Sequence, residues 1–283
     1  MFLIFRIVLV GLVLLAAPVQ AQVFWSVTDD HGNQNWLLGT VHSEDPRLLE
    51  FRPELLDALQ ASERLALELV PDAGMLDALN QAMHYDSDRL EQVLGSELYA
   101  EVVDLLEQHY GMGEPAVRRM RPWAVAMTLS IPAPQTGLFM DLALSFRASG
   151  MGLEVMALET LDEQLGFLQG FDEDSQVEMV RQAVEDFDRM DDLFEALIGA
   201  YLDGDLDRLE ALSRDEIDRM GSEIAEHFEQ VGLVERNQHM VERALPYLRE
   251  GGLVIAVGAL HLPGEDGLIE LLRAEGFGVE GVY

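Results

Sequence analysis

The clearest indication of the fold class of this chain is the segment Gly252-Leu253-Val254-Ile255-Ala256-Val257-Gly258-Ala259-Leu260-His261. It contains an uncharged run of apolar, partly β-branched residues, which is typical of a strand that is buried on both faces. Apolar residues at helical spacing precede it over Val234–Arg249, and a second helical pattern follows it up to Ala274. A buried strand between helices indicates an α/β fold.

Three further apolar runs share one property with this stretch, which is that each ends in a polar side chain of the kind that binds ligands. The runs and their end residues are Leu37–Val41 with His42, Leu65–Leu67 with Glu68, Leu153–Leu158 with Glu159, and Leu253–Leu260 with His261. The carboxyl ends of strands in an α/β sheet open onto the crevice where ligands bind. We therefore expect these side chains to converge at one edge of a central sheet.

The composition indicates a large folded core and excludes several partners. The chain has 283 residues, of which 49% are hydrophobic and 25% charged, so that intrinsic disorder is excluded for most of it. The 18 basic residues, all of them Arg, stand against 52 Asp and Glu, which gives a net charge of −34. A field this negative repels a phosphate backbone and an anionic lipid surface, so we expect no nucleic-acid partner. The acidic residues are densest over 172–229, where apolar positions at helical spacing predict a helical insertion with a solvated face.

The first 21 residues have the pattern of a secretory signal peptide. Arg6 is followed by the apolar stretch Ile7–Ala17 and by small residues that suit cleavage after Ala21. An uncleaved N-terminal anchor is the alternative, and no later segment looks transmembrane. The prediction is a periplasmic or secreted protein whose residues 22–283 form a single domain, without disulfides because the chain has no Cys.

Two of the strand-end histidines share a local pattern that points to a metal site. Gly39-Thr40-Val41-His42 and Gly258-Ala259-Leu260-His261 are both G-x-x-H. Two neutral imidazoles with one or two carboxylates are the usual donor set for Zn²⁺, Mn²⁺, Co²⁺ or Fe²⁺. We expect His42, His261, Glu68 and Glu159 to be ligands, with the glutamate that does not bind the ion free to act as a general base.

Arg236-Asn237, on the helix before the last buried strand, is the next candidate pair. The guanidinium can hold a substrate carboxylate or orient one of the glutamates, and the carboxamide can polarise a carbonyl. The chain has no P-loop, no G-x-G-x-x-G after a first strand, no G-x-S-x-G and no H-E-x-x-H. These absences disfavour a nucleotide enzyme, a serine hydrolase and a standard zincin.

Several separated blocks resemble the TraB/GumN family, which is related to the Tiki metalloproteases and to the pheromone-shutdown proteins. The blocks are Trp36-Leu37-Leu38-Gly39-Thr40-Val41-His42, Leu67-Glu68, Gly137 with Asp141, Leu158-Glu159-Thr160 with Gln164, Arg236-Asn237, and Val257 to Gly264 followed by Gly267-Leu268 and Leu271-Leu272. The resemblance implies an α/β fold with a mixed central sheet. It also implies a metal site of His42, His261, Glu68 and Glu159, in which Arg236 and Asn237 contact the substrate or the transition state.

From the residues and the resemblance together, we expect a metal-dependent hydrolase, most simply a peptidase in which Mn, Co or Zn activates water. The substrate is then a peptide or a small molecule. A different class of function stays open, namely a periplasmic protein that binds or sequesters a peptide, haem or metal without turnover. A third alternative is an accessory factor in envelope polysaccharide production.

Overall fold

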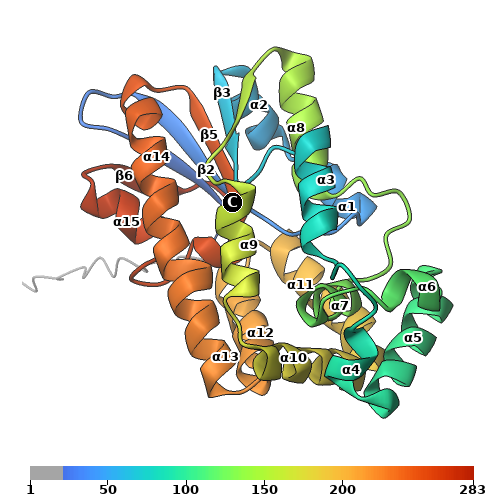
Figure 1. Ribbon diagram of the computed structural model, residues 1–283. Helices are drawn as coiled ribbons and strands as arrows, with labels where there is room; N and C mark the ends of the chain where they lie inside the picture. The colour runs from blue at the N-terminus through green and yellow to red at the C-terminus, as the bar shows by residue number, and fades with distance from the viewer. Residues whose placement is uncertain (1–21) are drawn as a thin grey trace, which may run out of the picture.

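The computed structural model describes residues 22–283, so the predicted signal peptide lies outside the described part of the chain. Its centre is a six-stranded sheet in the order β4-β3-β5-β2-β1-β6 (Figure 1). The strands are β1 (Phe24–Thr28), β2 (Gln34–Thr40), β3 (Arg64–Leu67), β4 (Glu154–Ala157), β5 (Leu253–Gly258) and β6 (Gly278–Gly281). β4, β3, β5 and β2 are parallel, whereas β1 is antiparallel to both β2 and β6. The mixed α/β fold is thus confirmed, and β6 lies at one edge of the sheet.

The stretch that predicted the fold forms β5, which lies between two of the three other strands that lead to candidate residues. β5 lies between β3 and β2, with Val254 opposite both Leu65 and Trp36. All its residues from Leu253 to Val257 are buried. A strand that is covered on both faces has no need of polar residues, which explains its continuous apolar sequence.

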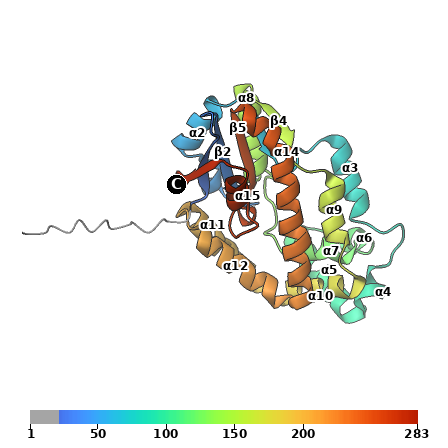
Figure 2. The same ribbon diagram turned by 90° about the vertical axis from the view of Figure 1, so that its left-hand side faces the viewer.

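Helices surround the sheet and extend well beyond it. Those of the first part of the chain are α1 (Pro46–Leu49), α2 (Pro53–Gln60), α3 (Ala73–Ala82), α4 (Leu90–Leu94), α5 (Ser96–Tyr110), α6 (Glu114–Val117), α7 (Pro122–Leu129) and α8 (Met140–Met151). Those of the second part are α9 (Leu161–Gln169), α10 (Glu173–Glu185), α11 (Met190–Leu202), α12 (Leu206–Arg219), α13 (Ser222–His227), α14 (Arg236–Glu250) and α15 (Leu268–Ala274). α8 packs along β3 and β4, and α14 packs against β5 and α15. In Figure 2, α14 runs from beside the sheet into the helical half of the molecule.

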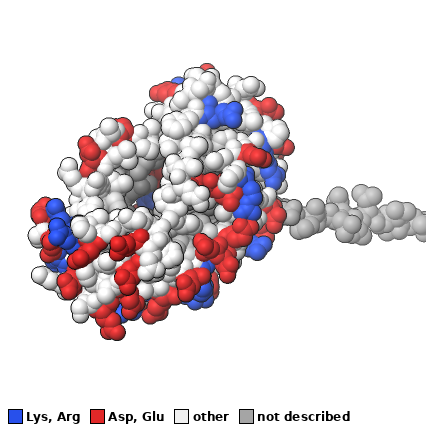
Figure 3. Space-filling model, turned by 90° about the vertical axis from the view of Figure 1, so that its right-hand side faces the viewer, with Lys and Arg blue, Asp and Glu red and all other residues white. Residues whose placement is uncertain are grey.

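The acidic segment 172–229 is helical, as predicted, and its helices contribute to two different cores. Val180 of α10 is buried with Trp123 of α7 in a core formed mainly by α4 to α7. Ile198 of α11 and Leu209 of α12 belong instead to the core around the sheet. The charged side chains face outward, and Figure 3 shows Asp and Glu in red spread over one face of the molecule and around its hollowed centre.

The chain is helical without a break from α13 to the end of α14. A π-helical segment, Phe228–Glu235, joins the two and ends immediately before Arg236. Within residues 22–283, no helix is both long and apolar enough to cross a membrane.

Candidate functional site

Glu68 and Glu159 lie side by side beyond the ends of β3 and β4. The two strands continue to pair after their last regular residues, since Leu158 N donates to Leu67 O at 2.7 Å and Glu159 N to Glu68 O at 3.0 Å. Parallel pairing in register therefore brings two carboxylates, far apart in the sequence, to the same point of the sheet edge. The Glu159 side chain is only 2% exposed and that of Glu68 is 25% exposed.

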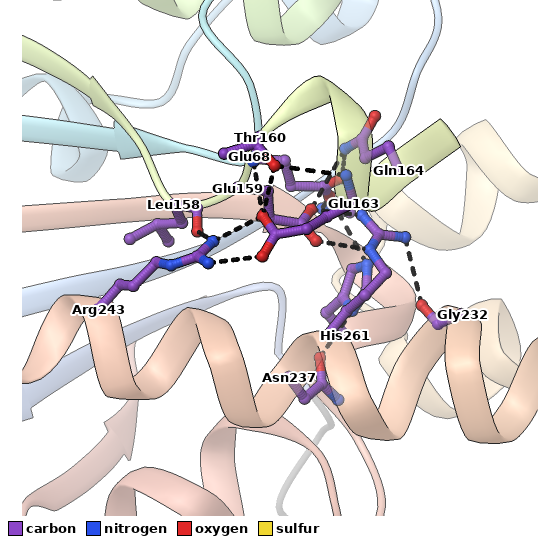
Figure 4. A network of polar contacts seen from close by, with 12 residues as sticks. Glu68, Leu158, Glu159, Thr160, Glu163, Gln164, Gly232, Asn237, Arg243 and His261 are labelled. Carbon is purple, nitrogen blue, oxygen red and sulfur yellow. Dashed lines mark hydrogen bonds and ion pairs between the residues drawn. The ribbon is translucent and has the colours of Figure 1, made fainter. Parts of the chain in front are cut away.

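Arg236 neutralises part of this charge by bonding to both carboxylates. Its Nε donates to Glu159 Oε1 at 2.8 Å, and its Nη2 donates to Glu159 Oε2 at 2.6 Å and to Glu68 Oε2 at 2.8 Å. Its Nη1 donates to the carbonyl of Gly232 in the π-helical segment at 3.2 Å. These bonds agree with one of the two roles expected of Arg236, the orientation of the glutamates. Figure 4 shows Glu68 and Glu159 within this network of polar contacts.

Helix α9 covers the carboxylate pair and is itself firmly held. Gln164 Nε2 lies 3.2 Å from both Glu68 Oε2 and Glu159 Oε2. A capping box of Thr160 and Glu163 begins the helix directly after Glu159. Arg243 of α14 then donates to the carbonyl of Leu158 at 2.6 Å and pairs with Glu163. These contacts fix the main chain on either side of Glu159.

The glycines of both G-x-x-H motifs allow close contacts, between β5 and Glu68 in one case and between β2 and the segment after β5 in the other. Gly258 N donates to Glu68 Oε1 at 2.6 Å, and a Cβ at this position would lie 3.2 Å from the same oxygen. A Cβ on Gly39 would lie 3.0 Å from Ala259 Cα. The two motifs, at opposite ends of the described chain, thus pack directly against each other.

Asn237 holds His261 in one orientation. Asn237 Nδ2 donates to the carbonyl of Asp266 at 2.8 Å, which leaves Asn237 Oδ1 to accept the Nδ1–H of His261 at 2.6 Å. Nε2 of His261 then carries the lone pair, and it lies 3.8 Å from Glu68 Oε1. Asn237 and His261 are both buried, so the structure gives Asn237 the positioning of the imidazole.

The charges of this network are set by burial and by mutual contact. Burial lowers the pKa of His261, which the nearby Glu68 only partly opposes, so that the imidazole is neutral at pH 7. Burial alone would raise the pKa of Glu68, but the positive charge of His261 in its protonated form, Arg236 and the Gly258 N–H lower it below its usual value. Burial likewise opposes the charge on Arg236, but its bonds to the two glutamates raise its pKa. Two carboxylates, one guanidinium and a neutral imidazole leave one net negative charge.

His42 lies apart from this network in the contacts that it makes. Its Nδ1 is 3.5 Å from Asp141 Oδ2, and its ring stacks on Phe139 with centroids 4.1 Å apart. The side chain is 63% exposed. Of the six candidate residues, the structure thus joins Glu68, Glu159, Arg236, Asn237 and His261, and it places His42 with partners of its own.

The donor set fits a metal ion in part. Two ligands of one ion, each about 2.1 Å away, are at most about 4 Å apart. His261 Nε2 and Glu68 Oε1 meet this condition, and the lone pair of Nε2 is free. In the part of the chain that the structure describes, no group of three or more His, Asp or Glu residues is close enough together to hold an ion. The expected four-ligand set is therefore not assembled, because Glu159 binds Arg236 and His42 contacts Asp141.

Gln164, which belongs to the motifs of the family resemblance, and two residues that the sequence analysis did not select complete the site. Gln164, Glu163 and Arg243 form the layer around Glu159. The sequence Thr160-x-x-Glu163 before an apolar helix is a capping-box signal and marks the start of α9. The bonds of Arg243 and Gln164 link distant parts of the chain and leave no such local pattern.

These features define an α/β protein with a polar site at the carboxyl edge of its parallel strands. A comparison with known families matches residues 23–281 to the TraB/PrgY/gumN family. The chain belongs to this family, which confirms the resemblance found in its motifs. No curated protein and no solved structure matches the chain.

Proposed function

We propose that this protein is a hydrolase, most simply a peptidase, that uses a divalent ion held by His261 and Glu68. The observation that carries this proposal is the orientation of His261. Its Nδ1–H is bonded to Asn237, and its Nε2 faces Glu68 Oε1 at 3.8 Å. Metal-binding histidines characteristically donate their other ring N–H to such a partner, which fixes the tautomer that binds the ion.

The other residues of the site keep these two ligands in the required state. The N–H of Gly258 and the guanidinium of Arg236 keep Glu68 ionised. Glu159, enclosed by Arg236 and Gln164, holds the guanidinium in place and is too buried to reach a substrate itself. When bound, the ion would supply a Lewis acid and a water of lowered pKa. Mn, Co and Zn all suit one imidazole and one carboxylate.

The signal-peptide pattern of Met1–Ala21 supports a periplasmic or secreted location for this reaction. The strongly acidic surface supports peptides or small molecules as substrates, because polyanions are repelled.

The experiment combines metal binding with cleavage of a mixed peptide library. After treatment with chelator, the protein is titrated with Mn²⁺, Co²⁺ and Zn²⁺ by calorimetry, and peptide products are followed by mass spectrometry. His261→Ala and Glu68→Gln should each lose both ion binding and cleavage. His239→Ala is the matched control, because His239 is exposed on α14, and it should retain both.

Two outcomes would overturn the proposal. Ion binding that is the same in the wild type, His261→Ala and His239→Ala would remove the proposed ligand pair. Ion or peptide binding by the wild type without any cleavage would replace the hydrolase by the sequestering alternative.

A further inference from the structure

Asp141, near the start of α8, lies between Thr40 and His42 at the end of β2. The hydroxyl of the buried Thr40 donates to Asp141 Oδ1 at 2.6 Å. The other oxygen, Oδ2, lies 3.5 Å from His42 Nδ1. The carboxylate is therefore fixed on one side by Thr40 and directed at the imidazole on the other.

The ring and the main chain of the His42 segment have further contacts with the residues that precede Asp141. The His42 ring is stacked on Phe139 at an interplanar angle of 11°. The next residue, Ser43, accepts a hydrogen bond from Met140 N at 3.0 Å through its carbonyl. The segment after β2 is thus joined to the beginning of α8 by the ring, the main chain and the carboxylate.

Glu44 strengthens the same connection. Its carboxylate accepts hydrogen bonds from the N–H groups of Gln135, Thr136 and Gly137 and from the Thr136 hydroxyl. These bonds lower the pKa of Glu44 to about 2, so the carboxylate stays ionised at neutral pH. The loop that carries Phe139 is in this way tied to the chain that carries His42.

The surroundings of His42 and His261 correspond closely. Each imidazole follows a G-x-x pattern at the end of a strand, and β2 and β5 are neighbours, with Thr40 paired to Gly258. Each Nδ1 faces an oxygen from the first turn of a long helix, Asn237 of α14 for His261 and Asp141 of α8 for His42. In both cases Nε2 is the nitrogen that remains for a ligand or a substrate.

We propose that Asp141 is a positioning residue of the site, which accepts the Nδ1–H of His42 and so makes His42 and His261 a matched pair of imidazoles with free Nε2 atoms. The role of this pair in hydrolysis rests on the proposed function, but the tautomer of His42 does not. Free histidine prefers the opposite neutral tautomer, with the proton on Nε2. A carboxylate at Nδ1 reverses this preference.

The tautomer is measured directly by long-range ¹H–¹⁵N NMR of the full ¹⁵N-labelled protein, at a pH where its 7 histidines are neutral. The His42 signals are assigned by their loss in His42→Ala. In the wild type, Nδ1 of His42 should have the shift of a protonated nitrogen and Nε2 that of an unprotonated one. In Asp141→Ala the two shifts should exchange, whereas Asp141→Asn should keep the wild-type pattern, because a carboxamide oxygen can accept the same hydrogen as Asn237 does for His261.

The signals of His261 are the internal control, because they should keep the Nδ1–H pattern in both Asp141 variants and show that the fold is intact. A wild-type His42 with its proton on Nε2 overturns the proposal without any variant, and so does an unchanged tautomer in a folded Asp141→Ala. Absence of cleavage in the wild type would refute the proposed function and leave the tautomer result standing.

Discussion

Replacement of Arg236 by methionine should destabilise the protein more than any comparable change on α14. The substitution leaves Glu68 and Glu159 next to each other without a counter-charge, and Glu159 is only 2% exposed. Removal of one partner from a buried ion pair costs about 3–5 kcal/mol, because the remaining charge is left desolvated. Arg243→Met is the matched control. It removes the same side chain two turns further along the helix, but the partner Glu163 is 31% exposed, so the expected cost is about 1 kcal/mol.

The free energy of unfolding of both variants is measured by urea titration at pH 7.5 and at pH 5.5. In Arg236→Met, the folded-state pKa of the carboxyl pair rises above its unfolded value, so the folded protein binds more protons than the unfolded chain. Its stability should therefore increase, relative to the wild type, as the pH falls between these values. Arg236→Met/Glu159→Gln should recover part of the loss at pH 7.5. A cost for Arg236→Met within about 1 kcal/mol of that for Arg243→Met, with no dependence on pH, would show that the two carboxylates do not need Arg236 as a counter-charge.

Two further predictions concern packing and pH. Gly39→Ala should cost about 1–3 kcal/mol of unfolding free energy, because its Cβ would lie 3.0 Å from the main chain at Ala259 and no side-chain rotation can relieve the contact. Gly199 lies in α11 and has nothing within 4 Å of an added Cβ, so Gly199→Ala should instead raise the free energy of unfolding by up to about 1 kcal/mol in the same denaturation assay. Equal effects of the two substitutions would contradict the packing argument. Glu163→Gln should be less stable than the wild type at pH 6, because its bonds to Arg243 lower the pKa of Glu163 to about 2 and this stabilisation is present above the unfolded pKa of 4.5. The difference, about 1 kcal/mol after solvent screening, should shrink as the pH falls toward 3, and a constant difference would show that the charge is not involved.

The strands and their end residues were predictable because their signals are local. The apolar runs of β2 and β5 have patterns that only a few neighbouring residues determine. The prediction that Glu68 and Glu159 would meet needed one further step, namely that parallel strands end at a common edge. Both expectations hold, and so does the helical character of 172–229.

The partners of the candidate residues were not predictable in the same way. The sequence allowed two roles for Arg236. Its bonds to both glutamates depend on the position of the start of α14, which follows directly on the π-helical segment. His42 was expected with the other ligands, but Phe139 and Asp141, about 100 residues away along the chain, give it separate contacts. Such pairings follow from tertiary structure and leave no periodic pattern in the sequence.

The position of β5 in the sheet has a consequence for how the protein acquires its structure. This strand belongs to the last part of the chain, yet it lies between β3 and β2 and pairs with both. Until it is inserted, two strand edges are unpaired, and contacts between such distant segments form slowly. During synthesis the site is therefore among the last features to form, because Gly258 and His261 arrive with β5 itself. A chain truncated before Leu253 would contain both glutamates and Arg236 but would lack the strand that joins them to the other half of the sheet.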